Sequence, residues 1–302
     1  MNRQALHSLF LITALLPVVF CGCTSNDDDH RNPATVNTNA NPHGQHPEAG
    51  RLEIPHLKGG YQNMFLVKRV VGYGINFCIE WDIVKKAQRW TAFRWDKSYH
   101  DDNIGRTEAW SEDFDIPEFY RTNREDFYSG SGYTRGHMIA SEDRQQRPIA
   151  LNEQTFLYSN MQPQLYDFNG GIWAKLEAKV RSWNNDAFRD TLYVCKGGTI
   201  DNSSQILEIV RKNTAYQLLV PKYFFMAVLC KDPRSTTNGG YKAIGFFLEH
   251  RRDYADEKNV APYIVSIDEL ERLTGIDFFC NLPDLYEEAA ESAVVRTAWG
   301  FR

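Results

Sequence analysis

Apolar and polar residues alternate in two neighbouring stretches of the chain, and this alternation predicts a β-hairpin. Residues 75–81 (INFCIEW) and 89–95 (RWTAFRW) are rich in β-branched and aromatic side chains with the two-residue period of a strand. Residues 82–88 would join them. Further apolar stretches have the length and composition of strands, at 192–195, 216–220, 223–229 and 242–248.

A three- to four-residue period appears between these strands and predicts helices. The predicted helices are residues 152–158, 172–183, a short one that starts at 266, and 287–293. Asn152 is the expected N-cap of the first, and Ser266 with Glu269 has the capping-box pattern. Strands and helices are mixed along the chain, so the predicted fold is α+β (mixed α/β), a central, mostly antiparallel sheet flanked by helices.

The first 23 residues are predicted to be a lipoprotein signal peptide. Arg3 is positive, residues 9–20 are apolar but too short to span a membrane comfortably, and Gly22 precedes Cys23 as in a bacterial lipobox. Cys23 would carry the lipid. This pattern predicts export and an outer-membrane lipoprotein that faces the periplasm or the cell surface. An ordinary cleaved signal peptide is the alternative.

Residues 24–50 are rich in Asn, Asp, Pro and Thr and are nearly empty of large apolar side chains. Because such a segment cannot bury enough apolar surface to fold, it is predicted to be a disordered tether. Residues 51–302 would then form the globular domain.

Composition restricts the classes of protein that fit. The chain has 302 residues, of which 42% are hydrophobic, enough for one large domain or two small ones. Its net charge of −5 argues against coating nucleic acid by bulk electrostatics, but it leaves room for a local basic cleft. The domain cysteines, at 78, 195, 230 and 280, form no CxxC pair, so a zinc site is not expected.

Two polar clusters, residues 133–138 and 159–164, suggest a site, and Asn169 and Glu177 follow closely. His137 can deprotonate water near neutral pH with little tuning of its pKa. The Asn169 oxygen can hold a divalent cation without cancelling its charge. Arginines nearby can meet the charge that grows on phosphorus. Together these residue types suit hydrolysis of a phosphodiester with one hard metal ion.

In their order along the chain, these segments resemble the DNA/RNA non-specific endonuclease family, the endonuclease G-like branch of the ββα-metal nucleases. Thr134-Arg135-Gly136-His137 is similar to the family's Asp-Arg-Gly-His signature. Other family-like segments are 159–164, 169–177, 220–224, 243–246 and 267–279, so the resemblance covers most of residues 60–285. It implies an active site on a ββα-metal finger, and DNA and RNA as substrates cut to 5′-phosphate and 3′-hydroxyl ends.

The resemblance also implies a role for each candidate residue. His137 matches the general base, Asn169 the sole direct protein ligand of Mg²⁺ (Mn²⁺ is the alternative), and Glu177 the residue that holds water around the metal. The catalytic arginines would be Arg106, Arg135 and Arg181. Asn160 and Gln164 would support these groups. Thr134 would do so too, although Asp is commonest there, and we expect activity to survive this difference.

Other functions fit the same residues less well. A catalytically weak or inactive nuclease fold could bind nucleic acid or a protein partner at the cell surface, and Thr134 and the negative net charge favour this mildly. A phosphodiesterase of small nucleotides and a scaffold protein of the envelope are further alternatives. The sequence predicts no oligomeric state.

Overall fold

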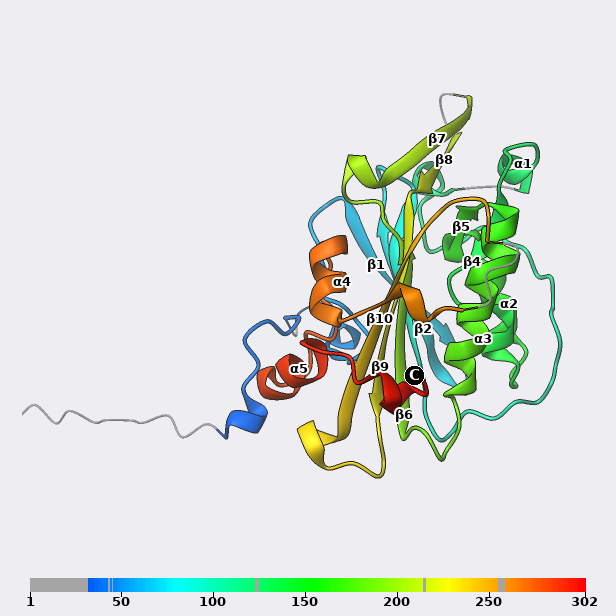
Figure 1. The fold of residues 1–302 in the computed structure, drawn as a ribbon. Helices are drawn as coiled ribbons and strands as arrows, with labels where there is room; N and C mark the ends of the chain where they lie inside the picture. Colours follow the sequence, from blue (N-terminus) through cyan, green and yellow to red (C-terminus); the bar gives the residue numbers. More distant parts are fainter. Residues whose placement is uncertain (1–31, 43, 45, 123–124, 214–215, 255–258) are drawn as a thin grey trace, which may run out of the picture. The chain divides into compact units, whose positions relative to one another are not determined.

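A seven-stranded sheet forms the centre of the protein (Figure 1). The structure, a computed structural model, describes residues 32–302 apart from 43, 45, 123–124, 214–215 and 255–258. In spatial order the strands are β1 (Asn63–Val70), β2 (Gly74–Asp82), β3 (Ala87–Trp95), β6 (Thr191–Gly198), β9 (Tyr223–Lys231), β10 (Tyr241–Glu249) and β11 (Ile264–Val265). Every neighbouring pair is antiparallel. The predicted α+β class and the predicted hairpin, now β2 and β3, are therefore confirmed.

Two smaller hairpins lie outside this sheet. They are β4 (Thr134–His137) with β5 (Met161–Gln164), and β7 (Ile206–Asn213) with β8 (Tyr216–Pro221). The helices are α1 (Glu125–Tyr128), α2 (Ala150–Glu153), α3 (Ala174–Ser182), α4 (Ile267–Thr274) and α5 (Asp284–Glu291). A π-type turn over Phe168–Trp173 leads into α3. The β4–β5 hairpin with α3 is the predicted ββα arrangement.

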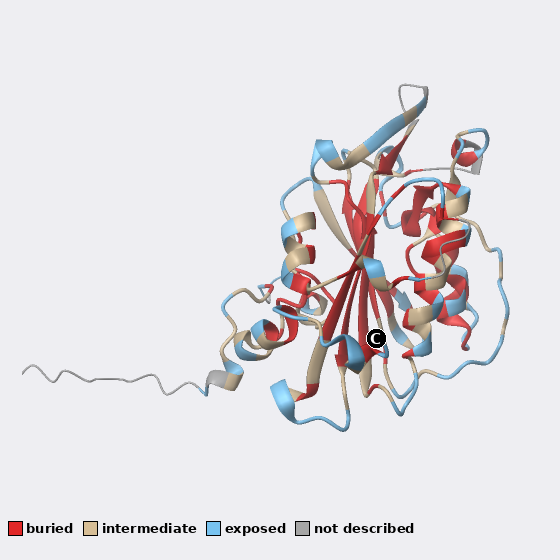
Figure 2. Cartoon of the chain, in the orientation of Figure 1, coloured by how far each residue is buried: buried red, intermediate tan, exposed pale blue. Residues whose placement is uncertain are grey.

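Both faces of the central sheet are buried, as the red strands in Figure 2 show. Phe77 and Ile79 of β2 pack in one apolar cluster with Leu176 of α3. Trp90 of β3 packs in a second cluster with Ile267 of α4. Because successive residues of a strand point to opposite faces of the sheet, a single strand can contribute side chains to both clusters. Helix α3 therefore covers one face, and α4 and α5 cover the other (Figure 1).

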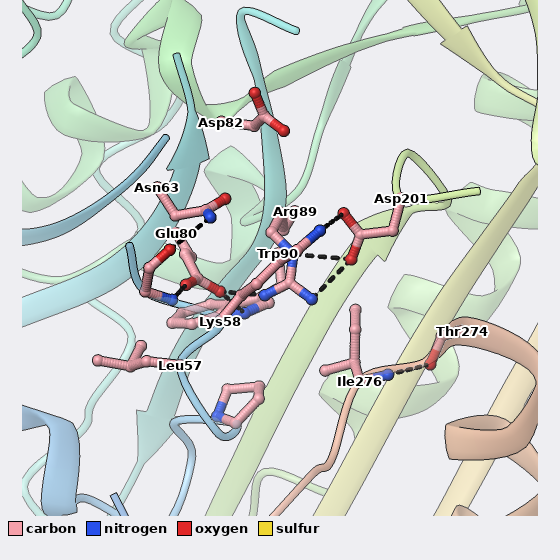
Figure 3. A network of polar contacts seen from close by, with 12 residues as sticks. Leu57, Lys58, Asn63, Glu80, Asp82, Arg89, Trp90, Asp201, Thr274 and Ile276 are labelled. Atoms are coloured by element: carbon pink, nitrogen blue, oxygen red, sulfur yellow. Dashed lines mark hydrogen bonds and ion pairs between the residues drawn. The ribbon is translucent and has the colours of Figure 1, made fainter. Parts of the chain in front are cut away.

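A chain of charged side chains, buried at Glu80 and Arg89 and more exposed at Asp201 and Lys58, joins the loop after β6 to β2 and β3 (Figure 3). Arg89 lies between two carboxylates, donating to Glu80 and, at 2.6 and 2.8 Å, to Asp201. Trp90 Nε1 donates to Glu80 at 3.1 Å, and Lys58 Nζ donates to Asp201 at 3.0 Å. Each charge in this network has a partner of opposite sign, as burial requires.

The folded domain begins earlier than the sequence suggested. Residues 24–50 were predicted to be disordered, yet the compact unit starts at Asn32. Asn41 is 1% exposed, and its Nδ2 atom donates to the carbonyls of Ala49 and Pro55 at 3.1 and 3.0 Å. Hydrogen bonds from Asn side chains thus replace apolar burial in anchoring this segment. Residues 24–31, the predicted signal peptide and Cys23 lie outside the described residues.

The predicted helix over 152–158 is wrong in form. Only α2 is α-helical here, followed by separate 3-10 turns at Gln154–Phe156 and Tyr158–Asn160. Asn152 is not an N-cap, because its fully buried Nδ2 donates to the carbonyls of Ser141 and Arg144 at 2.8 and 3.0 Å. These long-range hydrogen bonds outweigh the local capping preference.

Two further expectations concern the cysteines and the membrane. The four cysteines of the domain are free and buried, and Cys78, Cys195 and Cys230 lie in the apolar strands β2, β6 and β9. Within the described ranges, the helices all fall short of the length and apolar character that crossing a membrane requires.

Candidate active site

A cleft of about 550 Å³ opens beside the β4–β5 hairpin. Of the predicted site residues, those that line it are Arg106, Thr134, Arg135, His137, Asn169 and Glu177. Aromatic side chains from other segments complete the wall, notably Trp110, Tyr128 and Tyr133. The structure therefore brings together groups that are up to 71 residues apart in sequence, from Arg106 to Glu177.

The hairpin brings its two strands together around a glycine. Thr134 lies opposite Gln164, and His137 lies opposite Met161. A Cβ atom on Gly136 would lie 2.2 Å from Oε1 of Gln164, which is fully buried and cannot swing away. Gln164 therefore does not reach the cleft. It supports the hairpin from beneath, and it explains why only glycine fits between Arg135 and His137.

His137 presents one ring nitrogen without a partner. Its Nε2 atom is buried and makes no hydrogen bond within the described part of the chain. The hydrogen bond between its ring and the backbone of Arg135 therefore belongs to Nδ1, which donates. Phe156 and Trp110 pack against the ring, with centroids at 5.2 and 5.5 Å. A neutral imidazole held in this way carries its lone pair on Nε2.

The surroundings of His137 move its pKa away from the ordinary value near neutrality. Burial above all, and then the positive charge of Arg106, lower the pKa of His137 to about 3. The carboxylate of Glu108 acts in the opposite direction but does not outweigh them. The imidazole is therefore neutral, with its Nε2 lone pair unprotonated, throughout the physiological pH range.

Thr134 fixes the orientation of the Asn169 amide. Asn169 Nδ2 donates to Thr134 Oγ1 at 2.9 Å, and the Thr134 hydroxyl donates in turn to the carbonyl of Gln164, also at 2.9 Å. Since the amide nitrogen is bound to Thr134, the Oδ1 atom of Asn169 is left for a ligand in the cleft. The Thr134 hydroxyl thus supplies a hydrogen-bond acceptor for the Asn169 amide nitrogen at the position where Asp is commonest.

Below the cleft, four charged side chains form a buried network. Lys196 Nζ donates to Glu177 at 3.1 Å and to Asp143 at 3.0 Å, and Arg181 donates to the other oxygen of Asp143. Burial raises the pKa of Glu177, and Lys196 works against that rise. Burial would also raise the pKa of Asp143, but Lys196 and Arg181 outweigh it and hold that pKa below its usual range.

This network bears on the expected roles of Glu177 and Arg181. Glu177 and Arg181 share a face of α3, as predicted, but each binds a partner from outside the helix. Arg181 does not line the cleft. Its guanidinium instead neutralises Asp143 in the buried network below the cleft. Asp143 and Lys196 were missed. Lys196 did carry a signal, because a lysine that ends an apolar strand run must find a buried partner.

The two remaining arginines lie at the cleft wall. The Arg135 guanidinium stacks over the Trp110 ring, 3.8 Å from its centroid. Arg106 is exposed, lies over the Phe156 ring, and donates to Glu108 at 2.7 Å. Stacking leaves the edge of a guanidinium able to donate to an anion. Both positive charges are therefore placed to attract a phosphate.

Two buried side chains hold the ends of the hairpin. Asn160 accepts from the backbone N–H of Ile139 at 3.0 Å and donates to the carbonyl of Ile139 at 2.9 Å, which fixes the chain just after His137. His250, which the sequence did not suggest, accepts from the N–H of Leu165 at 2.7 Å. Asn160 therefore holds the backbone that follows His137.

The donors in the cleft fit a hard divalent cation. Mg²⁺ and Mn²⁺ prefer oxygen ligands and keep several waters when few protein atoms bind them. Asn169 offers an oriented neutral oxygen, and Glu177 adds a carboxylate at the same wall. The nearest nitrogen base, His137, remains free for proton transfer.

Comparison with known proteins shows which family this chain resembles. The family model of the DNA/RNA non-specific endonucleases matches residues 68–285. The mitochondrial nuclease EXOG of Danio rerio is 28% identical over 78% of this chain and 65% of its own length. A nuclease of Nostoc sp. is 29% identical over 72% of this chain and 76% of its own length. The chain spans less than two thirds of the Danio relative.

The fold is shared with a solved structure. A chain in the crystal structure of the EndoG/EndoGI complex, described as a study of the mechanism of EndoG inhibition, superposes with a TM-score of 0.57 at 21% identity. The superposition covers 74% of this chain and 89% of the other. The family model matches well over half of the residues, and the chain belongs to the DNA/RNA non-specific endonuclease family.

Proposed function

We propose that this protein is an endonuclease that hydrolyses phosphodiester bonds of DNA and RNA with the help of Mg²⁺ or Mn²⁺. Membership of the family and the named nucleases among its relatives support this. The observation that carries the proposal is one cleft lined both by His137, whose Nε2 has no hydrogen-bond partner among the described residues, and by Asn169, whose amide is oriented through Nδ2.

The reaction follows from these positions. His137 takes a proton from water on Nε2 as the water oxygen bonds to phosphorus. The bond from phosphorus to the 3′ oxygen then breaks, and that oxygen takes a proton from solvent, which leaves 5′-phosphate and 3′-hydroxyl ends. A divalent cation at Asn169 supplies Lewis-acid stabilisation of the charge on the leaving oxygen. Arg135 and Arg106 lie where they can bind the phosphate oxygens.

The same geometry accounts for little sequence preference. The charged groups of the cleft suit phosphates, which every nucleotide carries, and phosphate contacts contain no sequence information. A few arginines in a cleft provide such contacts even though the whole chain is negative. Binding should weaken as salt rises, because each phosphate contact releases counterions.

The experiment is to incubate the full-length protein with supercoiled plasmid, and separately with RNA, in Mg²⁺, in Mn²⁺ and in EDTA. We expect both polymers to be cut with either metal and neither to be cut in EDTA. A folded protein that binds plasmid in a gel-shift assay but cuts neither polymer would contradict the proposal in favour of a binding protein. Cleavage only of small nucleotide diesters would indicate a phosphodiesterase.

For location, we propose export and lipidation at Cys23, on the outer membrane and facing the periplasm or the cell surface. The order of Arg3, the apolar stretch 9–20 and Cys23 supports this. Labelling with a radioactive fatty acid in a Gram-negative host tests it. Label in the wild-type protein that is lost in Cys23→Ala, together with release from the membrane fraction, is expected. Unlabelled wild-type protein in the soluble fraction would contradict it.

A further inference from the structure

Three carboxylates converge on the side of the sheet away from the cleft. Asp268 and Glu271 lie three residues apart on α4, and Glu291 is the last residue of α5. One oxygen from each lies within 4.8 Å of the other two. Helices α4 and α5 lie across the sheet from α3 (Figure 1), and none of the three residues lines the candidate active site.

Glu291 is the residue that calls for an explanation. It is 5% exposed, and its Oε1 atom is buried without a hydrogen-bond partner among the described residues. A buried carboxylate oxygen without a hydrogen-bond partner is costly unless the carboxyl group is protonated or neutralised by a cation. The Glu291 side chain therefore points into a cluster of carboxylates that lacks a positively charged group to balance it.

The protein supplies no positive group there. Among the residues that the structure describes, Arg and Lys form no ion pair with Asp268, Glu271 or Glu291, and the nearby Arg272 pairs with Glu269 at 2.6 Å instead. The surroundings add negative charge from Asp277 and Glu287, whose carboxylates both accept from Asn39.

The titration behaviour of the group agrees with this excess of negative charge. Burial, followed by the charges of the neighbouring carboxylates, raises the pKa of Glu291 to about 11. Burial also raises the pKa of Glu271 to about 8, although its hydrogen bond from the N–H of Phe278 works against the rise.

The spacing suits a large divalent cation. Because the three oxygens all lie within 4.8 Å of one another, one ion with oxygen ligands at about 2.4 Å, as Ca²⁺ has, can contact all three. Mg²⁺ needs near-ideal octahedral geometry at about 2.1 Å and is reluctant to lose its waters, which fits three converging carboxylates less well. Asp268 is exposed, so water can complete the coordination from the open side.

We propose that Asp268, Glu271 and Glu291 bind a Ca²⁺-class divalent cation that fastens α4 to α5. The effect reaches the start of the domain, because Asn39 Nδ2 donates to Glu287 of α5 at 2.9 Å. The site is separate from the cleft, and it stabilises the fold rather than taking part in phosphodiester hydrolysis.

Thermal unfolding of the full-length protein, freed of metal with EDTA and titrated with CaCl₂, tests this site. Because Ca²⁺ can also bind in the cleft, the titration is repeated with Asn169→Ala. Glu291→Gln removes the buried charge, and Glu288→Gln removes an exposed charge from the same helix as a matched control. We expect a saturable rise in Tm in the wild type, Asn169→Ala and Glu288→Gln, and its loss in Glu291→Gln.

Two results would overturn the proposal. One is a Ca²⁺-dependent rise that Asn169→Ala abolishes and Glu291→Gln keeps, which would place the ion in the cleft. The other is a wild type that does not respond to Ca²⁺, with a higher Tm in Glu291→Gln, which would identify a protonated carboxyl cluster. If Glu291→Gln does not fold, the exposed variant Asp268→Asn replaces it. A clear loss of Ca²⁺ affinity supports the site, and an unchanged affinity refutes it.

Discussion

Replacing Thr134 with valine tests how the cleft orients its metal ligand. The hydroxyl accepts from Asn169 Nδ2 and donates to the carbonyl of Gln164, both at 2.9 Å. Valine has nearly the same shape but can do neither. In Thr134→Val the Asn169 amide therefore loses the contact that distinguishes its nitrogen from its oxygen.

The size of the effect follows from those two hydrogen bonds. Each contributes about 0.5–1.5 kcal/mol, and outer groups that orient a metal ligand typically matter by about 10–100-fold in affinity or activity. A factor of ten corresponds to about 1.4 kcal/mol. We therefore expect Thr134→Val to cut plasmid about 10–100-fold more slowly at limiting Mg²⁺, with a smaller deficit at saturating Mg²⁺.

The assay is the initial rate of supercoiled plasmid nicking against Mg²⁺ concentration, with urea unfolding to check the fold. Thr134→Ser keeps the hydroxyl and should stay within about threefold of the wild type, which is about 0.7 kcal/mol. Wild-type rates in Thr134→Val at every Mg²⁺ concentration would refute this account of Asn169. A gain of orders of magnitude in Thr134→Asp would show instead that threonine itself limits activity.

Three other changes test the surroundings of the site by urea unfolding. Gly136→Ala should lower the unfolding free energy by about 1–3 kcal/mol, because the new Cβ overlaps Gln164. Gly170→Ala, where nothing lies within 4 Å, is the control and should differ little from the wild type. Lys196→Met should cost about 3–5 kcal/mol, since it leaves the Glu177 carboxylate without its partner and Asp143 with Arg181 alone; a loss below about 1 kcal/mol would contradict the network. Because the folded pKa of His137 (about 3) lies below its ordinary 6.5, the unfolded chain takes up the proton first as pH falls. Stability from this residue is thus complete above pH 6.5 and falls by about 1.4 kcal/mol per unit below it. Between pH 6 and 5 the wild type should lose stability faster than His137→Asn, and equal slopes would exclude the lowered pKa.

Five of the seven strands of the central sheet, β2, β3, β6, β9 and β10, were predicted from local pattern, whereas β1 and β11 were missed. The alternation in β2 and β3 and the near-continuous apolar run in β9 were the signals. The order of the polar motifs was equally informative, since it placed His137, Asn169 and Glu177 in one site before any geometry was known.

The hairpin that carries His137 was not predictable from local pattern. β4 and β5 are four residues each, polar, and contain Gly136 and Pro163, which are unfavourable for strands in isolation. Their pairing depends on contacts between segments far apart in sequence, such as the packing of Gln164 on Gly136.

Other features depend on burial, which the sequence encodes only through the whole fold. The lowered pKa of His137 comes from a pocket closed by Phe156 and Trp110. The pairing of Lys196 with Asp143 joins a sheet strand to a distant loop. The anchoring of Asn41 looked like disorder because its segment lacks apolar residues.

The central claim is that His137 is the base of a nuclease, and its removal tests that claim most directly. The rate of plasmid cleavage at saturating Mg²⁺ is compared between the wild type and His137→Ala, after both have been shown to be folded by circular dichroism. The account predicts a loss of about 10²–10⁴-fold, the usual contribution of a positioned base. A folded His137→Ala variant that cuts plasmid at close to the wild-type rate would contradict it.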